Sequence, residues 1–224
     1  MTIQLDYSDK SGNLDCLIFC DEKYNPLNLN KDFKSLEIKS IKQFLKKVSL
    51  IDEEIVCFDL SPFQKIIFIK LIRDKLDSSI EKIGAKLFDF LKKNKLNNIK
   101  FLKDNILEAN SKYEFFLNKL LHGLKLKSYL FDKYITIQKK HKIIINIPKS
   151  FKKDFDKKNL YFKSLFEGIN LTKDLVSEPG NILHPDEYAN RLKKLKSVGL
   201  KVTIFDKEKL KKLGMNALLG VGQG

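Results

Sequence analysis

Arginine is nearly absent from a chain that is otherwise rich in positive charge. Lysine and arginine together number 43 and the formal net charge is +15, but only Arg73 and Arg191 are arginines. A basic surface binds nucleic acid by releasing counterions from phosphate, whereas sequence-reading proteins favour the bidentate fork of arginine. The chain is also rich in Asn, Ile and Phe, so a genome-wide compositional bias is the simple explanation of its many lysines. A basic DNA-associated or regulatory module, with weak DNA binding at low salt, is the alternative interpretation.

Long apolar runs are lacking too. Runs such as 66–69 are far too short to cross a bilayer, so no association with a membrane is expected. The first ten residues, MTIQLDYSDK, contain two acidic side chains and no apolar stretch, which excludes a secretory signal of the usual build. We therefore expect a soluble, cytoplasmic protein.

Cysteine is scarce, and the spacing of the cysteines shows no paired motif. The three cysteines, Cys16, Cys20 and Cys57, form no CxxC pair, which excludes a disulfide framework and a zinc ribbon as these are usually built. Buried thiols in a reducing compartment are the simplest interpretation.

Short apolar runs alternate with amphipathic segments over the first 150 residues, a pattern that predicts an α/β domain. Most of the runs consist of β-branched or aromatic residues, which favours strands. The strand candidates are LDCLIFC (14–20), EIVCFDL (54–60), QKIIFIKLI (64–72), NIKFL (98–102) and HKIIINI (141–147).

Apolar residues with helical spacing predict two clear helices and one weaker helix. The clear stripes run from Ile80 to Leu91, with Gly84 among them, and from Tyr113 to Leu124. The weaker helix lies near 31–47, where the period is only approximate. Each clear stripe is expected to pack on the sheet.

The chain changes character after Pro148. We predict an N-terminal domain over 1–150, a linker helix over 151–178 and a second α/β unit over 179–224. In the second unit, SEPGN (177–181) is a turn in which Gly180 is free to take a positive φ. A helix over 185–198 that Gly199 ends, a strand over 200–206, a short helix and an apolar run over 217–224 follow.

No local motif indicates an active site. Gly220, Gly222 and Gly224 would suit a phosphate-binding turn after an apolar strand, but the helix and the distant acidic residue of that fingerprint are missing. Asp186 and Glu187 are adjacent and suit a helix N-terminus better than acid and base roles.

The histidines give no metal signal either. His122, His141 and His184 stand in different elements without a partner at ligand spacing. Residues alone therefore indicate an α/β protein of unknown activity.

Three sequence segments late in the chain are typical of a known protein family. LTKDLVSEPGN, KVTIFD and LGMNALLGVGQG occur in that order within 167–224, and this segment resembles the start of the catalytic domain in the leucyl (cytosol) aminopeptidase family. HGLKLKSYLFDKY (122–134) resembles a segment late in that family's N-terminal domain. His184 stands where a capping Thr is usual, which should weaken the helix start by about 1 kcal/mol.

The resemblance implies a macro-domain-like N-terminal domain, with a mixed sheet flanked by helices, followed by a truncated catalytic domain. Members of the family are cytoplasmic homohexamers that remove N-terminal residues from peptides with two divalent metals, commonly manganese or zinc. Their metal ligands and catalytic Lys and Arg belong to motifs downstream of VGQG. The resemblance therefore assigns no catalytic, metal-binding or substrate-binding residue to this sequence, and we expect the chain alone to be inactive, with 180–224 poorly ordered.

Overall fold

The computed structural model describes residues 2–9, 12–29, 32–50, 53–71, 78–136 and 142–222. By its internal contacts the chain divides into two units, Met1–Asn170 and Leu171–Gly224. The boundary between them falls within the long helix α5 (Lys152–Ser177).

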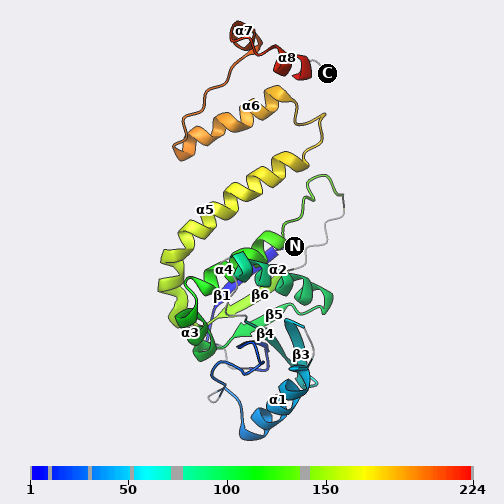
Figure 1. The fold of residues 1–224 in the computed structure, drawn as a ribbon, viewed down its shortest axis with the longest axis vertical. Coiled ribbons are helices and arrows are strands. Elements are labelled where there is room, and N and C mark those ends of the chain that lie inside the picture. Colours follow the sequence, from blue (N-terminus) through cyan, green and yellow to red (C-terminus); the bar gives the residue numbers. More distant parts are fainter. Residues whose placement is uncertain are drawn as a thin grey trace. The chain divides into compact units, whose positions relative to one another are not determined.

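A six-stranded mixed sheet forms the centre of the first unit (Figure 1). The strands are β1 (Thr2–Tyr7), β2 (Asp15–Cys20), β3 (Ile55–Ser61), β4 (Gln64–Lys70), β5 (Asn98–Phe101) and β6 (Lys142–Ile147). They lie in the order β1-β6-β5-β2-β4-β3, and every neighbouring pair is parallel except β3 with β4. The predicted mixed α/β fold with helices flanking the sheet is confirmed.

Helices cover the sheet on both faces (Figure 1). In the first unit they are α1 (Ser35–Val48), α2 (Ser78–Lys93), α3 (Lys103–Lys112), α4 (Phe116–Lys127), the short 3-10 helix η1 (Lys149–Phe151) and the start of α5. The alternation of β2 serves both faces, because neighbouring side chains of a strand point to opposite sides. Leu17 and Phe19 pack with α2 and α4, whereas Ile18 packs with α1.

Helices α2 and α4 approach each other through glycines. A Cβ built on Gly84 would lie 2.1 Å from the carbonyl oxygen of Leu120, and one built on Gly123 would lie 2.0 Å from the carbonyl oxygen of Glu81. No real Cβ tolerates such distances from backbone, so only glycine permits this crossing.

The sequence missed two elements of this unit and misplaced one helix end. Strand β1 alternates apolar residues with Thr2, Gln4 and Asp6 at the edge of the sheet, and helix α3 is mostly polar, so neither has a strong apolar signal. Helix α4 begins at Phe116 rather than at Tyr113, because Tyr113 is extended and ends α3. All five predicted strands and the long helix after Pro148 are present.

The second unit is made of short helices. They are α6 (Pro185–Lys193), the 3-10 helix η2 (Lys194–Val198), α7 (Lys207–Lys212) and α8 (Asn216–Gly222). Gly199 ends η2 with φ of 88°, as the turn out of a helix requires. Gly180 lies in the predicted turn but takes no positive φ. His184 precedes α6, and its side chain makes no capping hydrogen bond.

Two predictions for this unit were wrong. Residues 200–206 form no strand, because among the described residues no other strand pairs with them and a lone strand leaves its backbone groups without partners. The apolar run after Asn216 is helix α8 rather than a strand, since a helix forms backbone hydrogen bonds within its own segment and needs no partner strand. Gly220 and Gly222 therefore lie in a helix and open no phosphate-binding turn, and residues 223–224 lie outside the described residues.

Apolar side chains of the second unit are largely exposed. None of the residues in α6, η2 or α7 is buried, and none of the described residues of α8 is buried. Val198 is 72% exposed and Val221 is 81% exposed. A segment without a buried core has little to resist local opening.

We therefore predict that limited proteolysis cuts between 180 and 222 well before it cuts between 54 and 71 or between 78 and 136. Mass spectrometry of the early fragments measures this, with urea-unfolded chain as the control for intrinsic protease preference. Equal protection of the two regions would contradict the prediction.

Candidate functional site

A cleft lies at the carboxyl ends of the central strands β2 and β4. It has a volume of about 350 Å³, and its lining includes Cys20, Asp21, Lys23, Leu71, Lys112 and Tyr113. Ligands of open α/β sheets bind outside the carboxyl ends of the strands, and the volume is within the range of small-molecule sites. This cleft is therefore a candidate binding site.

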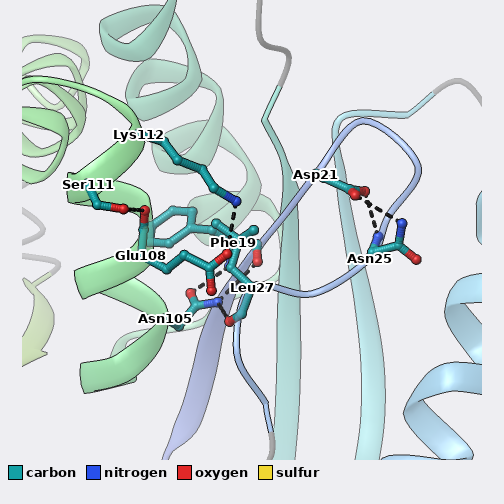
Figure 2. Close-up of polar contacts among 8 residues, drawn as sticks. All are labelled: Phe19, Asp21, Asn25, Leu27, Asn105, Glu108, Ser111 and Lys112. Carbon is teal, nitrogen blue, oxygen red and sulfur yellow. Dashed lines mark hydrogen bonds and ion pairs between the residues drawn. The ribbon is translucent and has the colours of Figure 1, made fainter.

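The loop after β2 is held by the carboxylate of Asp21 (Figure 2). Oδ1 of Asp21 accepts hydrogen bonds from the backbone N–H groups of Lys23, at 2.9 Å, and Asn25, at 2.8 Å, and Oδ2 accepts one from Nδ2 of Asn25 at 2.9 Å. Partial burial opposes the charge of Asp21, but these hydrogen bonds outweigh it, and the pKa of the carboxyl lies below its usual value. The loop geometry is thus fixed by a side chain that stays ionised.

Asn105 of helix α3 joins this loop to the sheet. Its side chain is fully buried, and its Oδ1 accepts a hydrogen bond from the backbone N–H of Phe19 at 2.8 Å. Its Nδ2 donates to the carbonyl oxygens of Phe19, at 3.1 Å, and of Leu27. One amide therefore connects β2, the following loop and α3 (Figure 2).

The cleft carries charges of both signs but no reactive pair. Nζ of Lys112 lies 2.9 Å from Oε1 of Glu108, and its charge also lowers the pKa of Asp21. Burial strongly raises the pKa of the Cys20 thiol, so this sulfur is a poor nucleophile at neutral pH. The arrangement suits binding of a polar ligand rather than covalent chemistry.

The cysteines are thiols packed in the domain. Cys16 and Cys20 are buried, Cys57 is half-buried, and all three are free. Burial raises the pKa of Cys16 to about 11. These positions fit the structural interpretation of the cysteines.

The histidines do not converge. Nδ1 of His122 lies 2.7 Å from Oε1 of Glu81, within the packing of α2 against α4. His184 belongs to the second unit, and His141 lies outside the described residues. In the part of the chain that the structure describes, no group of three or more His, Cys, Asp or Glu side chains is placed to hold a metal ion.

Asp186 and Glu187 do not form an acid–base pair. Both lie in the first turn of α6, and Oε1 of Glu187 accepts a hydrogen bond from Nε of Arg191 at 2.9 Å. Arg191 also donates from its Nη1 to Oε1 of Glu178, at 2.8 Å, and the side chain of Glu178 is only 1% exposed. The hydrogen bond from Arg191 lowers the pKa of Glu187. This cluster fixes the start of α6 against the preceding turn.

Glu178 is the member of that cluster which the sequence did not single out. The pairing of Glu187 with Arg191 was not predicted either, although a spacing of four residues on a helix is typical of such pairs. Residue spacing does not predict the contact of Glu178 with the same guanidinium. That contact depends on the geometry of the turn between Ser177 and Pro185.

Comparison with known proteins shows which family the second unit resembles. The profile of the cytosol aminopeptidase family, catalytic domain, matches residues 170–224. A probable cytosol aminopeptidase of Phytoplasma australiense is 37% identical over 157 residues, which cover 66% of this chain and 30% of that protein. One from Phytoplasma mali (strain AT) is 44% identical over 109 residues, which cover 46% of this chain and 22% of that protein.

The chain is thus similar to the cytosol aminopeptidase family, and residues 170–224 match the catalytic domain of that family. It spans less than a third of the length of these curated relatives. Among solved structures, a mutant of tomato leucine aminopeptidase matches with a TM-score of 0.66 at 19% identity, over 95% of this chain and 46% of that one. The bottromycin maturation enzyme BotP in complex with Mn matches with a TM-score of 0.53 at 13% identity, over 90% of this chain and 40% of that one. These likenesses show the fold.

The described residues of this chain do not fit a dinuclear metal site, because they contain no group of three or more His, Cys, Asp or Glu side chains placed to hold a metal ion. In the described part of 170–224, Glu178 and Glu187 bind Arg191, and the carboxylate of Asp206 caps α7 by accepting a hydrogen bond from the backbone N–H of Lys209. A two-metal site needs several carboxylates directed at one point. We therefore assign no metal chemistry to these residues. Nothing in the comparisons supports the alternative of a DNA-associated module.

No helix among the described residues is both long enough and apolar enough to cross a membrane.

Proposed function

We propose that this chain is a fragment of a metal-dependent leucyl aminopeptidase that hydrolyses N-terminal residues from peptides. Residues 1–150 supply the macro-domain-like N-terminal domain, 151–178 the linker helix, and 179–224 the first part of the catalytic domain. The single observation that carries the proposal is the match of residues 170–224 to the catalytic domain of the family.

The whole enzyme would be a cytoplasmic homohexamer with two divalent metals, manganese or zinc, in each active site. Such metals polarise the scissile carbonyl and supply hydroxide at neutral pH. The complex of BotP with Mn supports manganese as one of the metals. The residues of this chain contribute architecture: the packed sheet, the long helix α5 and the turn that Arg191 fixes.

We predict that the isolated 224-residue chain does not hydrolyse leucyl-p-nitroanilide in the presence of manganese or zinc. Glu178 and Glu187 are bound to Arg191 and Asp206 caps a helix, and the described residues contain no group of three or more His, Cys, Asp or Glu side chains placed to hold a metal ion. We therefore expect the metal ligands of the whole enzyme to lie outside this chain. Release of p-nitroaniline is measured at 405 nm, with a purified leucine aminopeptidase as the positive control.

The assay is run beside a metal-only blank and beside chain heated past its unfolding transition. Turnover by the folded chain above both controls would overturn the assignment of this chain as the inactive part. The family assignment would survive that result, because it rests on the sequence match and not on the assay.

A further inference from the structure

A second cleft opens beside the edge strand of the sheet, away from the carboxyl ends of β2 and β4. It has a volume of about 420 Å³ and lies between the start of β1, the segment after α4 and the part of α5 that belongs to the first unit. Its lining includes Ile3, Lys125, Leu130, Asp132, Phe166 and Asn170. All of these residues lie within Met1–Asn170.

Lys125 is a partly buried cation in the lining of this cleft. We find no ion pair of its ammonium with a carboxylate among the described residues. The charged group that acts on it is another cation, Lys163, which itself lies 4.0 Å from Oε1 of Glu167. Burial and then Lys163 lower the pKa of Lys125. A lysine in such a position gains from an anion that enters the cleft.

Asn170 places a second unsatisfied group in the same lining. Its Oδ1 is buried without a hydrogen-bond partner, although buried polar atoms in folded proteins are nearly always paired. The torsion that turns a terminal amide is broad, so a small rotation presents this oxygen to the cleft. The missing partner is a hydrogen-bond donor.

We propose that this cleft binds the carboxyl-terminal end of a peptide or an N-acylated amino acid. Lys125 would pair with the carboxylate, and the oxygen of Asn170 would accept the adjacent amide N–H. The apolar side chain of the ligand would contact Ile3, Leu130 and Phe166. Nothing in this proposal depends on the peptidase function proposed above.

A monovalent carboxylate suits the cleft better than a phosphate group. The lining offers a single lysine and no arginine, and it also contains the carboxylate of Asp132, which would repel a dianion. Phosphate sites usually combine several cationic or N–H donors. Oδ1 of Asn170 can form a hydrogen bond only with a ligand that carries a hydrogen-bond donor.

Four probes separate these features in isothermal titration with the full 224-residue chain. N-acetyl-leucine carries both groups, N-acetyl-leucinamide lacks the carboxylate, 4-methylpentanoate lacks the amide, and inorganic phosphate is the rival anion. We expect saturable binding of N-acetyl-leucine about 10-fold tighter than that of N-acetyl-leucinamide, which loses a hydrogen bond to a charged group. We expect it to be about 3-fold or more tighter than that of 4-methylpentanoate, which loses a hydrogen bond between neutral groups.

Variants locate the binding. Lys125→Met should weaken N-acetyl-leucine about 10-fold or more and Lys125→Arg less than about 3-fold. Asn170→Leu should weaken N-acetyl-leucine but leave 4-methylpentanoate unchanged. Lys127→Met is the matched control and should have no effect, because Lys127 lies in α4 like Lys125 but is exposed and pairs with Asp89 of α2.

The thermal unfolding midpoint of each variant shows that it is folded. Equal affinity for the acid and the amide, tighter binding of phosphate, no saturable binding, or unchanged binding by Lys125→Met would each overturn the proposal. Because the Lys125→Arg variant and the probe series on unaltered protein are independent tests, a Lys125→Met variant that fails to fold does not remove the test.

Discussion

Replacing Gly123 or Gly84 with alanine is expected to destabilise the first unit by about 3 kcal/mol or more, beyond the usual cost of overpacking because the clash is with backbone. The added Cβ would lie 2.0 Å from the carbonyl oxygen of Glu81 or 2.1 Å from that of Leu120. Helices α2 and α4 would have to separate and lose the contacts of the apolar side chains between them. Urea unfolding followed by circular dichroism measures the change.

Gly168 gives a matched control within a helix. A Cβ added there meets nothing within 4 Å outside its own helix, so Gly168→Ala should stabilise by about 0.5–1 kcal/mol through helix propensity alone. Gly84→Ala brings the same gain in helix propensity. Its overall effect on stability is expected to be destabilising only because α2 and α4 cross in close contact at this residue. A stabilising Gly84→Ala substitution would show that the two helices are not in this close contact.

Replacing Asn105 with alanine is expected to cost about 3 kcal/mol or more, because each buried group left without a partner costs about 1–3 kcal/mol. The substitution removes the acceptor for the N–H of Phe19 and the donor for the carbonyl oxygens of Phe19 and Leu27. Phe19 is fully buried and Leu27 is 6% exposed. The carbonyl oxygen of Phe19 keeps the hydrogen bond from the backbone N–H of Leu27, so the N–H of Phe19 and the carbonyl oxygen of Leu27 account for most of the expected loss. Urea unfolding of the variant measures the loss.

Asn94 separates the effect of burial from that of losing an amide. Its Nδ2 donates to the carbonyl oxygen of Phe90 at 2.8 Å, in an exposed position, so Asn94→Ala should change stability by about 0.5 kcal/mol or less. Asn105→Asp adds a further test, since aspartate keeps the acceptor but cannot donate to the two carbonyl oxygens. Equal losses for Asn94→Ala and Asn105→Ala would refute the role of Asn105 as the junction of β2, its loop and α3.

Both predictions concern groups that position the candidate clefts. Asn105 holds the loop that lines the cleft at β2 and β4, and the crossing at Gly123 sets α4, whose last turns carry Lys125 to the second cleft. Loss of either contact should therefore loosen a cleft as well as the core. Binding at the two clefts therefore depends on packing contacts that lie outside the clefts themselves.

Strong apolar periodicity predicted elements well, and weak periodicity did not. The runs over 64–72 and 141–147 each contain an unbroken apolar stretch, 66–69 and 143–145, because both faces of their strands are covered, and each run contains a strand of the structure. Strand β1 and helix α3 are partly exposed, so polar residues dilute their patterns. In the second unit, the predicted strand over 200–206 has the right residues but no partner among the described residues.

Residue order alone determined the α/β class, five strands, the long helix after Pro148 and the family of the second unit, because each of these depends on local periodicity or on a contiguous segment. Tertiary structure decided the rest. Asn105 meets Phe19 across 86 positions, Gly123 meets Glu81 from another helix, and Arg191 meets Glu178 across a turn. Contacts between distant positions leave no trace in spacing along the chain, since they depend on where the folded backbone brings each side chain.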